Sequence, residues 1–360
     1  MLSTQALNAI VFCEGAFATT YGKTAHGLVR FTRRYRVCAV IDSTLSGRDA
    51  GEFLDARPSG IPIAANVAEA LEAAEKAGRP ASHFVVGIAV EGRQLPESLV
   101  TAASEALQAG LHIDSGLHVF LSEYQPLAQL AASRRLKIRD IRKPPAVEDL
   151  HFFSGRIEEV GAFRTAVLGT DSAIGKRTTA WLLIRDLEKR GLSAELIGTG
   201  QTAWMQGAEY SLVMDSLIND FVAGEIEHAV LSAWEQKQPA HIIIEGQGSL
   251  MNPAFPGGFE ILAAARPHFI VLQHAPARRE YDGFPGYPLH PLATQIQALE
   301  LISGKKVIAI SVNHQGMTRE EVPGVCRSIE NETGLPCCDP LVDGSDILVD
   351  AILEAAKSCR

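Results

Sequence analysis

The segment from residue 163 to 190 constrains the fold most, because a glycine-bounded loop in it joins a strand to a helix. Phe163–Leu168 is mostly apolar and strand-like, residues 169–175 form the loop, and Lys176 opens an amphipathic helix that ends near Arg190. In such a unit the backbone N–H groups and the helix N-terminus point at one spot, where a lysine adds a full positive charge. The segment therefore predicts a site for a phosphorylated ligand.

The residue after this lysine departs from nucleotide-hydrolysing P-loops, which place there the Ser or Thr that holds Mg²⁺. That position is Arg177 in this chain, with Thr178 directly beyond it. We therefore expect a loop that binds a phosphorylated ligand without having to split it. The loop residues expected to bind this ligand are Gly169, Thr170, Asp171, Ser172, Gly175, Lys176, Arg177 and Thr178.

Strands and helices alternate along the chain, which predicts parallel, doubly wound sheets. The first part runs from a strand at Asn8–Cys13, through a helix at Val67–Ala77 capped by Asn66, to the sequence Arg-Lys-Pro-Pro at 142–145. Its two prolines forbid a helix and discourage strand pairing. The alternation then restarts, so we predict two α/β domains, over residues 1–143 and 144–360.

Composition limits the partners of these domains. The formal net charge of -9 gives no general attraction to nucleic acid or anionic membranes. No apolar run approaches the roughly 20 residues of a membrane-spanning helix, and the N-terminus lacks a basic signal-peptide region. The six cysteines are scattered without a CxxC pair, which favours a reduced compartment. We expect a cytoplasmic protein with a small-molecule substrate, no nucleic-acid or membrane partner and no metal site.

The loop after the strand at Ala194–Gly198 is a second candidate for ligand binding, because ligand loops lie at the carboxyl ends of parallel strands. The glycine at Gly200 permits close backbone approach, and Trp204 offers a flat face for an adenine or a thioester arm. A tight loop with a packed tryptophan is an equally good interpretation of these residues.

Two further strands end in candidate catalytic groups. Glu245 ends a buried strand, and a partly desolvated carboxylate at a strand mouth has the raised pKa that a general base needs. In a nucleotide hydrolase the same acid would be associated with Mg²⁺, and structural capping is a third interpretation. His274 ends the following strand and could accept a proton near neutral pH, although a lone histidine there is more often structural. We rank Glu245 first and His274 second.

Arginines are the candidates for holding substrate carboxylates, since a guanidinium binds a carboxylate through two parallel hydrogen bonds. Arg278 and Arg279 follow His274, and Arg48 lies in a loop of the first domain. The first strand–helix connection, residues 13–24, lacks GxGxxG, so it does not indicate dinucleotide binding. Without that fingerprint Asp42, at the end of the second strand, is only a weak candidate for a ribose-binding acid.

These motifs in combination resemble known proteins. Gly169–Lys176 resembles the phosphate loop of dethiobiotin synthetase and its relatives. The whole set resembles a family long classed as a domain of unknown function, and it comprises Gly22–Gly27, Gly169–Ala180, Gly198–Trp204, Glu245–Leu250 and Gln273-His274. The resemblance covers nearly the whole chain and implies a Rossmann-like N-terminal domain and a P-loop NTPase-like C-terminal domain. The family includes a D-glutamate N-acetyltransferase, which implies acetyl-CoA as co-substrate.

Three functions remain open. The first is an N-acetyltransferase that moves the acetyl group of acetyl-CoA to an acidic amino acid, D-glutamate above all; CoA carries a pyrophosphate and a 3′-phosphate for the loop to hold. The second is an ATP-dependent ligase or kinase of the dethiobiotin-synthetase-like class, in which Thr178 reaches Mg²⁺ after a one-residue shift. The third is a non-catalytic nucleotide- or CoA-binding protein. We expect a homo-oligomer, since enzymes of this size are commonly oligomeric.

Overall fold

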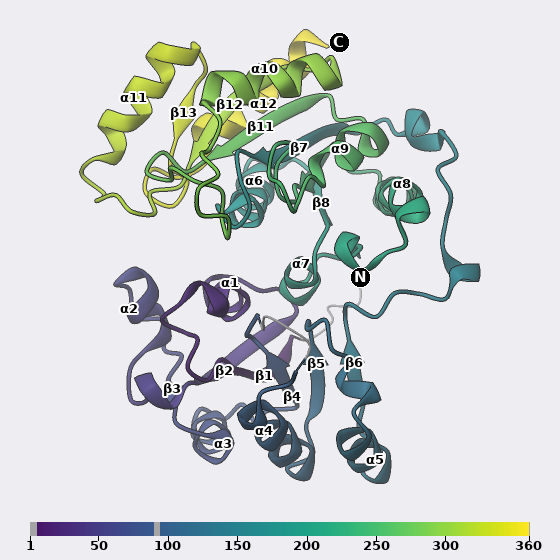
Figure 1. The fold of residues 1–360 in the computed structure, drawn as a ribbon, viewed down its shortest axis with the longest axis vertical. Helices are drawn as coiled ribbons and strands as arrows, with labels where there is room; N and C mark the ends of the chain where they lie inside the picture. The colour runs from purple at the N-terminus through teal and green to yellow at the C-terminus, as the bar shows by residue number, and fades with distance from the viewer. Residues whose placement is uncertain (1–5, 90–93, 360) are drawn as a thin grey trace. The chain divides into compact units, whose positions relative to one another are not determined.

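The computed structural model describes residues 6–89 and 94–359, which form two compact units (Figure 1). Unit 1 holds the described residues up to Pro144 together with Gln201–Ala208, and unit 2 holds Pro145–Gly200 and Glu209 onward. Each unit contains one sheet, with six strands in unit 1 and seven in unit 2, and the paired strands of both sheets run parallel. The predicted fold class, two α/β domains with parallel sheets, is confirmed.

The sheet of unit 1 has the strand order β3-β2-β1-β4-β5-β6, the order of dinucleotide-binding Rossmann sheets. The strands are β1 (Leu7–Phe12), β2 (Tyr35–Ile41), β3 (Ile63–Ala64), β4 (His83–Val86), β5 (His112–Ser115) and β6 (Ile138–Asp140). The helices are α1 (Lys23–Arg30), α2 (Ala50–Asp55), α3 (Val67–Lys76), α4 (Glu97–Gln108) and α5 (Gln125–Ser133).

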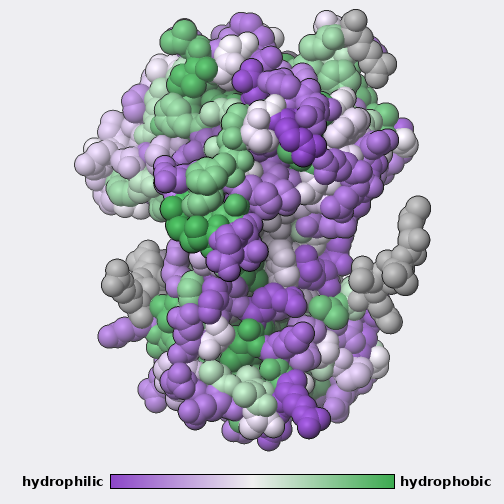
Figure 2. Space-filling view, turned by 90° about the vertical axis from the view of Figure 1, so that its right-hand side faces the viewer, coloured by the Kyte–Doolittle hydropathy of each residue, from purple (hydrophilic) through white to green (hydrophobic). Residues whose placement is uncertain are grey.

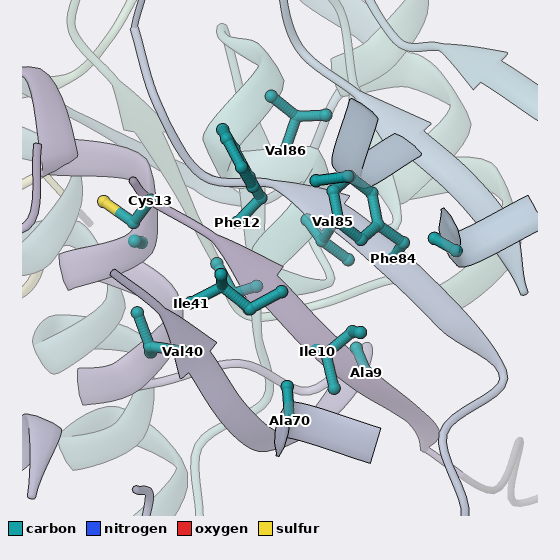
Figure 3. Close-up of a cluster of buried hydrophobic side chains, with 14 of the residues drawn as sticks. Ala9, Ile10, Phe12, Cys13, Val40, Ile41, Ala70, Phe84, Val85 and Val86 are labelled. Atoms are coloured by element: carbon teal, nitrogen blue, oxygen red, sulfur yellow. The ribbon is translucent and has the colours of Figure 1, made fainter. Parts of the chain in front are cut away.

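β1 lies in the middle of this sheet because its side chains are apolar on both faces. Residues 9–12 are all buried, as expected for a parallel strand that is covered by helices on both sides. Figure 3 shows Phe12 beside Phe84 of β4, and their ring centroids are 5.8 Å apart. This central strand pairs in parallel with both of its neighbours, β2 and β4.

A segment from much later in the chain completes unit 1. α7 (Gln201–Gln206) packs beside α1 (Figure 1), and Met205 is fully buried in the core of unit 1. The Gln206 side-chain amide donates to the carbonyls of Gly27 and Phe31. The sequence predicted a loop over 198–204, and that prediction is wrong for 201–204, which are helical because Ala203 and Met205 of this segment are buried.

In unit 2 the sheet order is β13-β12-β11-β7-β10-β8-β9. The strands are β7 (Phe163–Gly169), β8 (Ala194–Gly198), β9 (Tyr210–Ser211), β10 (His241–Glu245), β11 (Phe269–His274), β12 (Val307–Val312) and β13 (Cys337–Cys338). The helices are α6 (Lys176–Lys189), α8 (Asn219–Lys237), α9 (Gly258–Glu260), α10 (Leu292–Ser303), α11 (Val322–Thr333) and α12 (Asp346–Ser358). β7 lies between β10 and β11, where the strand order changes direction, so the loop after β7 emerges where such folds bind ligands.

Before β7 the chain runs along α8 as a strap, residues 151–157. Glu225 of α8 accepts hydrogen bonds of 2.8 Å from both the backbone N–H and Nδ1 of His151. Glu227 accepts three more from the later part of the strap. Gly224 lies under the strap backbone, and a Cβ atom there would be only 1.9 Å from the carbonyl oxygen of His151. The strap is therefore fixed to α8 at a distance that only glycine permits.

None of the helices within residues 6–89 and 94–359 combines the length and apolarity that crossing a membrane requires. The face drawn in Figure 2 is largely hydrophilic, and hydrophobic residues reach it in separate small patches. The six cysteines are free thiols, and Cys359 is the exposed one among them.

Candidate functional site

The loop after β7 has the geometry of an anion-binding nest. Ala173 and Gly175 both adopt positive φ, 51° and 100°, which turns successive N–H groups inward. Within the described part of the chain, the backbone N–H groups of residues 171–175 donate to no protein acceptor. Because a non-glycine residue in this conformation is strained, Ala173 indicates that the loop is held in shape by its surroundings.

Lys176 lies buried under this loop. Its Nζ donates to the carbonyl oxygen of Asp171 at 2.6 Å. Burial lowers the pKa of Lys176 to about 8, and the negative charges of Asp171 and Glu245 oppose this shift. The lysine stem passes close to two glycines. A Cβ atom on Gly169 would lie 2.9 Å from Cδ of Lys176, and one on Gly246 would lie 3.1 Å from it, so the absence of both side chains makes room for the stem. An anion in the nest would offset the lost hydration that lowers the pKa of this ammonium group.

The carboxylate of Asp171 holds the nest in shape through a set of hydrogen bonds, here called the brace. It is fully buried and accepts hydrogen bonds from Asn252 Nδ2 at 2.8 Å, Arg278 Nη1 at 2.7 Å and the Asp282 backbone N–H at 2.8 Å. Arg278 Nη1 also donates to the carbonyl oxygen of Ser172 at 2.8 Å. The arrangement favours a bracing role for Arg278, whose predicted role was to hold a substrate carboxylate.

The other side chains of the loop and of the helix start differ in their burial and in their hydrogen bonds. Ser172 Oγ donates to Asp282 Oδ2 at 3.0 Å, so this hydroxyl takes part in the brace. Thr170 is fully buried. Arg177 and Thr178 are half-buried on the first turn of α6, and Arg177 occupies the position at which hydrolytic P-loops carry their Mg²⁺ ligand.

Glu245 is buried at the carboxyl end of β10. Its Oε2 accepts a 3.0 Å hydrogen bond from the Thr199 backbone N–H, and Thr199 Oγ1 donates to the Glu245 carbonyl. Burial raises the pKa of Glu245, while the charges of Arg177 and Lys176 and the Thr199 bond pull it down. The pKa of a general base is often raised by burial in this way, and the predicted role of Glu245 as the base stays a prediction.

His274 ends β11, half-buried beside the loop. Its Nδ1 lies 3.0 Å from Thr170 Oγ1. Burial lowers the pKa of His274 to about 4, so the imidazole is neutral at neutral pH. If Nδ1 carries the proton and donates to Thr170, Nε2 has a free lone pair and can act as a base. In the other tautomer Nδ1 accepts the hydrogen bond from Thr170, and Nε2 carries the proton.

Arg279 and Gly200 also belong to unit 2. The Arg279 side chain is exposed and has no acceptor among the described residues, in contrast to its neighbour Arg278. At Gly200 a Cβ atom would lie 2.8 Å from Gln247 Nε2, so the backbone after β8 does approach a neighbouring side chain closely.

Trp204 and Arg48 belong to unit 1, whereas the phosphate loop belongs to unit 2. The guanidinium of Arg34 lies 3.7 Å from the centroid of a Trp204 ring, and that of Arg139 lies 5.1 Å away. Arg48 lies over the ring of Phe53 at 4.6 Å. The cofactor-binding role of Trp204 and the substrate-binding role of Arg48 stay predictions.

Asp42 of unit 1 has a structural role at the end of β2. Its Oδ2 accepts from the backbone N–H of Phe17, and its Oδ1 accepts from the N–H and hydroxyl of Thr44. Both carboxylate oxygens therefore accept hydrogen bonds from loop backbone, and these contacts give Asp42 a structural role in place of a ribose-binding one.

Sequence reasoning assigned no role to the amides that shape the nest. Asn252 binds Asp171, and Asn313 Nδ2 donates to the carbonyl of Ile174 at 2.8 Å. The Gln273 side chain accepts from Thr179 on α6. The available signal was position alone, because Gln273 and Asn313 lie at or just after the ends of β11 and β12.

Comparison with known proteins covers both units. Residues 43–144 match the family model described as a Rossmann-like domain, DUF1611_N, and residues 151–349 match that described as a P-loop domain, DUF1611_C, both domains of unknown function. A crystal structure of a DUF1611 family protein from Anabaena variabilis superposes with a TM-score of 0.88 at 29% identity, covering 97% of this chain and 99% of that chain.

Two curated relatives are named D-glutamate N-acetyltransferase. The protein from a Pseudoalteromonas species is 30% identical over 282 residues, which is 76% of this chain and 82% of the relative. The protein from Tritonibacter scottomollicae is 29% identical over 289 residues, which is 78% of this chain and 84% of the relative.

Proposed function

Because this chain belongs to the DUF1611 family, in which curated relatives are D-glutamate N-acetyltransferases, we propose that it transfers the acetyl group of acetyl-CoA to the amine of D-glutamate. One observation carries the proposal beyond the family. The phosphate nest keeps its open N–H groups and its buried lysine but has Arg177 in place of the Mg²⁺ hydroxyl. Acetyl transfer needs the phosphates of CoA to be held and not cleaved.

In this proposal the nest and Lys176 bind the CoA pyrophosphate. N–H groups at the start of a helix and a buried ammonium group both favour a dianionic ligand. Arg177, on the first turn of α6, adds a second cation, and its charge acts on Glu245 as that of Lys176 does. The Asp171–Arg278 brace holds the loop open before the ligand arrives, so little ordering cost remains at binding.

The transfer requires a neutral amine on the substrate. Glu245 accepts a proton from the substrate ammonium group, and the free amine attacks the thioester carbonyl carbon. An N–C bond forms, the C–S bond breaks, and CoA leaves as a thiolate; the nitrogen gives up its second proton, which is the one that the thiolate takes up. Backbone N–H groups near the thioester stabilise the oxyanion of the tetrahedral intermediate. Arg279 is an exposed cation of unit 2, five residues after His274, and in this proposal it holds a substrate carboxylate.

Glu245→Gln tests the base. The amide oxygen can still accept the Thr199 N–H bond, so the variant is expected to fold, but turnover should fall by about 10²–10⁴-fold, the usual contribution of a general base. In the wild type kcat rises as pH rises through the pKa of Glu245, because only the ionised carboxylate accepts a proton; the variant should lose that limb. Retained turnover in Glu245→Gln, with loss in His274→Gln, would transfer the role to His274.

A thiol-release assay tests the activity itself. Purified protein is mixed with acetyl-CoA and either D- or L-glutamate, without metal or ATP, and free CoA thiol is followed. Release with D-glutamate is the expected result. CoA binding without turnover on any amino acid would favour a non-catalytic binding protein.

The half-buried hydroxyl of Thr178, one residue beyond Arg177, favours a second candidate, an ATP-dependent ligase or kinase. In that case thiol release would be absent, and Mg²⁺-dependent ADP formation would appear when ATP is added.

A further inference from the structure

Unit 1 contains a groove of about 720 Å³. Its walls are the end of α1, the start of β2, residues 59–62 and the end of α3 with the residues after it. β3 pairs with β2 only at Val40 and Ile41, so within the described residues the first half of β2 has no strand beyond it on that side. The groove therefore lies along an open stretch of the sheet edge, at the amino-terminal part of β2.

The charged residues that line the groove are all positive. Four of its lining residues are cations and none is an acid, in a chain whose formal net charge is -9; the cations are Arg30, Arg36, Lys76 and Arg79. Arg30 forms an ion pair with Asp55, and Lys76 forms one with Glu72. Arg36 and Arg79 are exposed, and no described residue accepts a hydrogen bond from either guanidinium. Two cations of the groove thus lack a protein counter-charge.

These two arginines flank one buried side chain. The Cys38 thiol lies 3.4 Å from the carbonyl oxygen of Arg36 and 3.5 Å from that of Arg79. Arg36 is the one exposed residue of β2, between the buried Tyr35 and Val37. The floor beside them is apolar, since Leu28, Val37 and Cys38 are all buried. Arg36 and Arg79 therefore both line the groove beside buried apolar side chains.

We propose that this groove binds a small organic dianion, with two phosphate or carboxylate groups on a partly apolar body. Guanidinium groups match both anions through paired hydrogen bonds, and the volume falls in the range of roughly 300–1,000 Å³ that is typical of small-molecule sites. The proposal is independent of acetyl transfer, because the groove belongs to unit 1 and the phosphate loop to unit 2.

Hydrogen–deuterium exchange of the full chain locates the binding. The probes are ADP without metal, for the phosphate class, and glutarate, for the carboxylate class, each at ~10 mM, which is well above a ~1 mM Kd. We expect slower exchange in segments 28–38, 59–62 and 73–79 with at least one probe. Slower exchange at 169–178 with ADP reports the phosphate loop separately.

The double variant Arg36→Gln/Arg79→Gln should raise the Kd for the groove by at least about tenfold, since each charged hydrogen bond contributes substantially. The matched control is Arg57→Gln/Arg327→Gln, which removes the same charge from two other exposed positions and should leave the groove signal unchanged. Protection with ADP alone identifies a phosphate ligand, and protection with glutarate alone a dicarboxylate. No protection with either probe, or protection that survives the double variant, overturns the proposal.

Discussion

Replacing Lys176 with methionine is expected to lower kcat/KM for acetyl-CoA by about 100-fold, mainly through a higher KM, as loss of a buried charged partner of the phosphates implies. Methionine keeps most of the volume of the lysine stem under the loop, so the nest should persist while its central cation is lost. The measurement is thiol release at varied acetyl-CoA, together with direct CoA binding by calorimetry.

The control is Lys305→Met, which removes an exposed lysine from the same unit and should change neither quantity. The wild type offers an internal check through pH. The pKa of Lys176 is about 8 without ligand, and a bound phosphate should raise it. Affinity is therefore greatest where the lysine is charged and falls as pH rises through about 8. Equal pH dependence in wild type and Lys176→Met would show that this lysine does not contact the ligand.

Gly224→Ala is expected to destabilise the protein by about 3 kcal/mol, the upper range for overpacking a fixed backbone. In an ordinary helix interior the same change stabilises by up to about 1 kcal/mol. Here the new Cβ would lie 1.9 Å from the carbonyl oxygen and 2.5 Å from the carbonyl carbon of His151. The strap must therefore lift, which breaks its bonds to Glu225 and Glu227. Urea unfolding monitored by circular dichroism measures the change.

Gly324→Ala is the matched helical control. A Cβ on Gly324 in α11 meets nothing within 4 Å, so this variant should be neutral or slightly more stable. If both variants shift the urea midpoint in the same direction by similar amounts, the strap does not pack on α8 as described.

Local patterns in the sequence predicted the parts of the site that depend on neighbours along the chain. The β7–loop–α6 unit is one, because the strand, the loop glycines and Lys176 all lie within a short segment. The cap of α3 is another: Asn66 was predicted to cap this helix, and its side chain accepts from the backbone N–H of Glu69. The placement of Glu245 at a strand end follows in the same way from an apolar run that ends in an acid.

The roles of charged side chains depend on partners far along the chain, and these could not be predicted. Arg278 and Arg279 are adjacent and looked equivalent, yet Arg278 binds Asp171, 107 positions away, while Arg279 faces solvent. Trp204 follows a strand of unit 2 but belongs to unit 1, because burial of α7 against the core of unit 1 outweighs its position in sequence. A pattern of residue types does not reveal which distant residue will form a hydrogen bond with a given side chain.

The return of α7 to unit 1 sets an order for folding during synthesis. N-terminal domains usually fold first as the chain emerges from the ribosome. Unit 1 cannot complete its core in that way, because Met205 and the rest of 201–208 are made only after the whole phosphate loop. The nascent chain must therefore hold an unfinished first domain, with an uncovered apolar surface at α1, until residue 208 has emerged. The N-terminal unit expressed alone, ending at Pro144, would remain in that unfinished state.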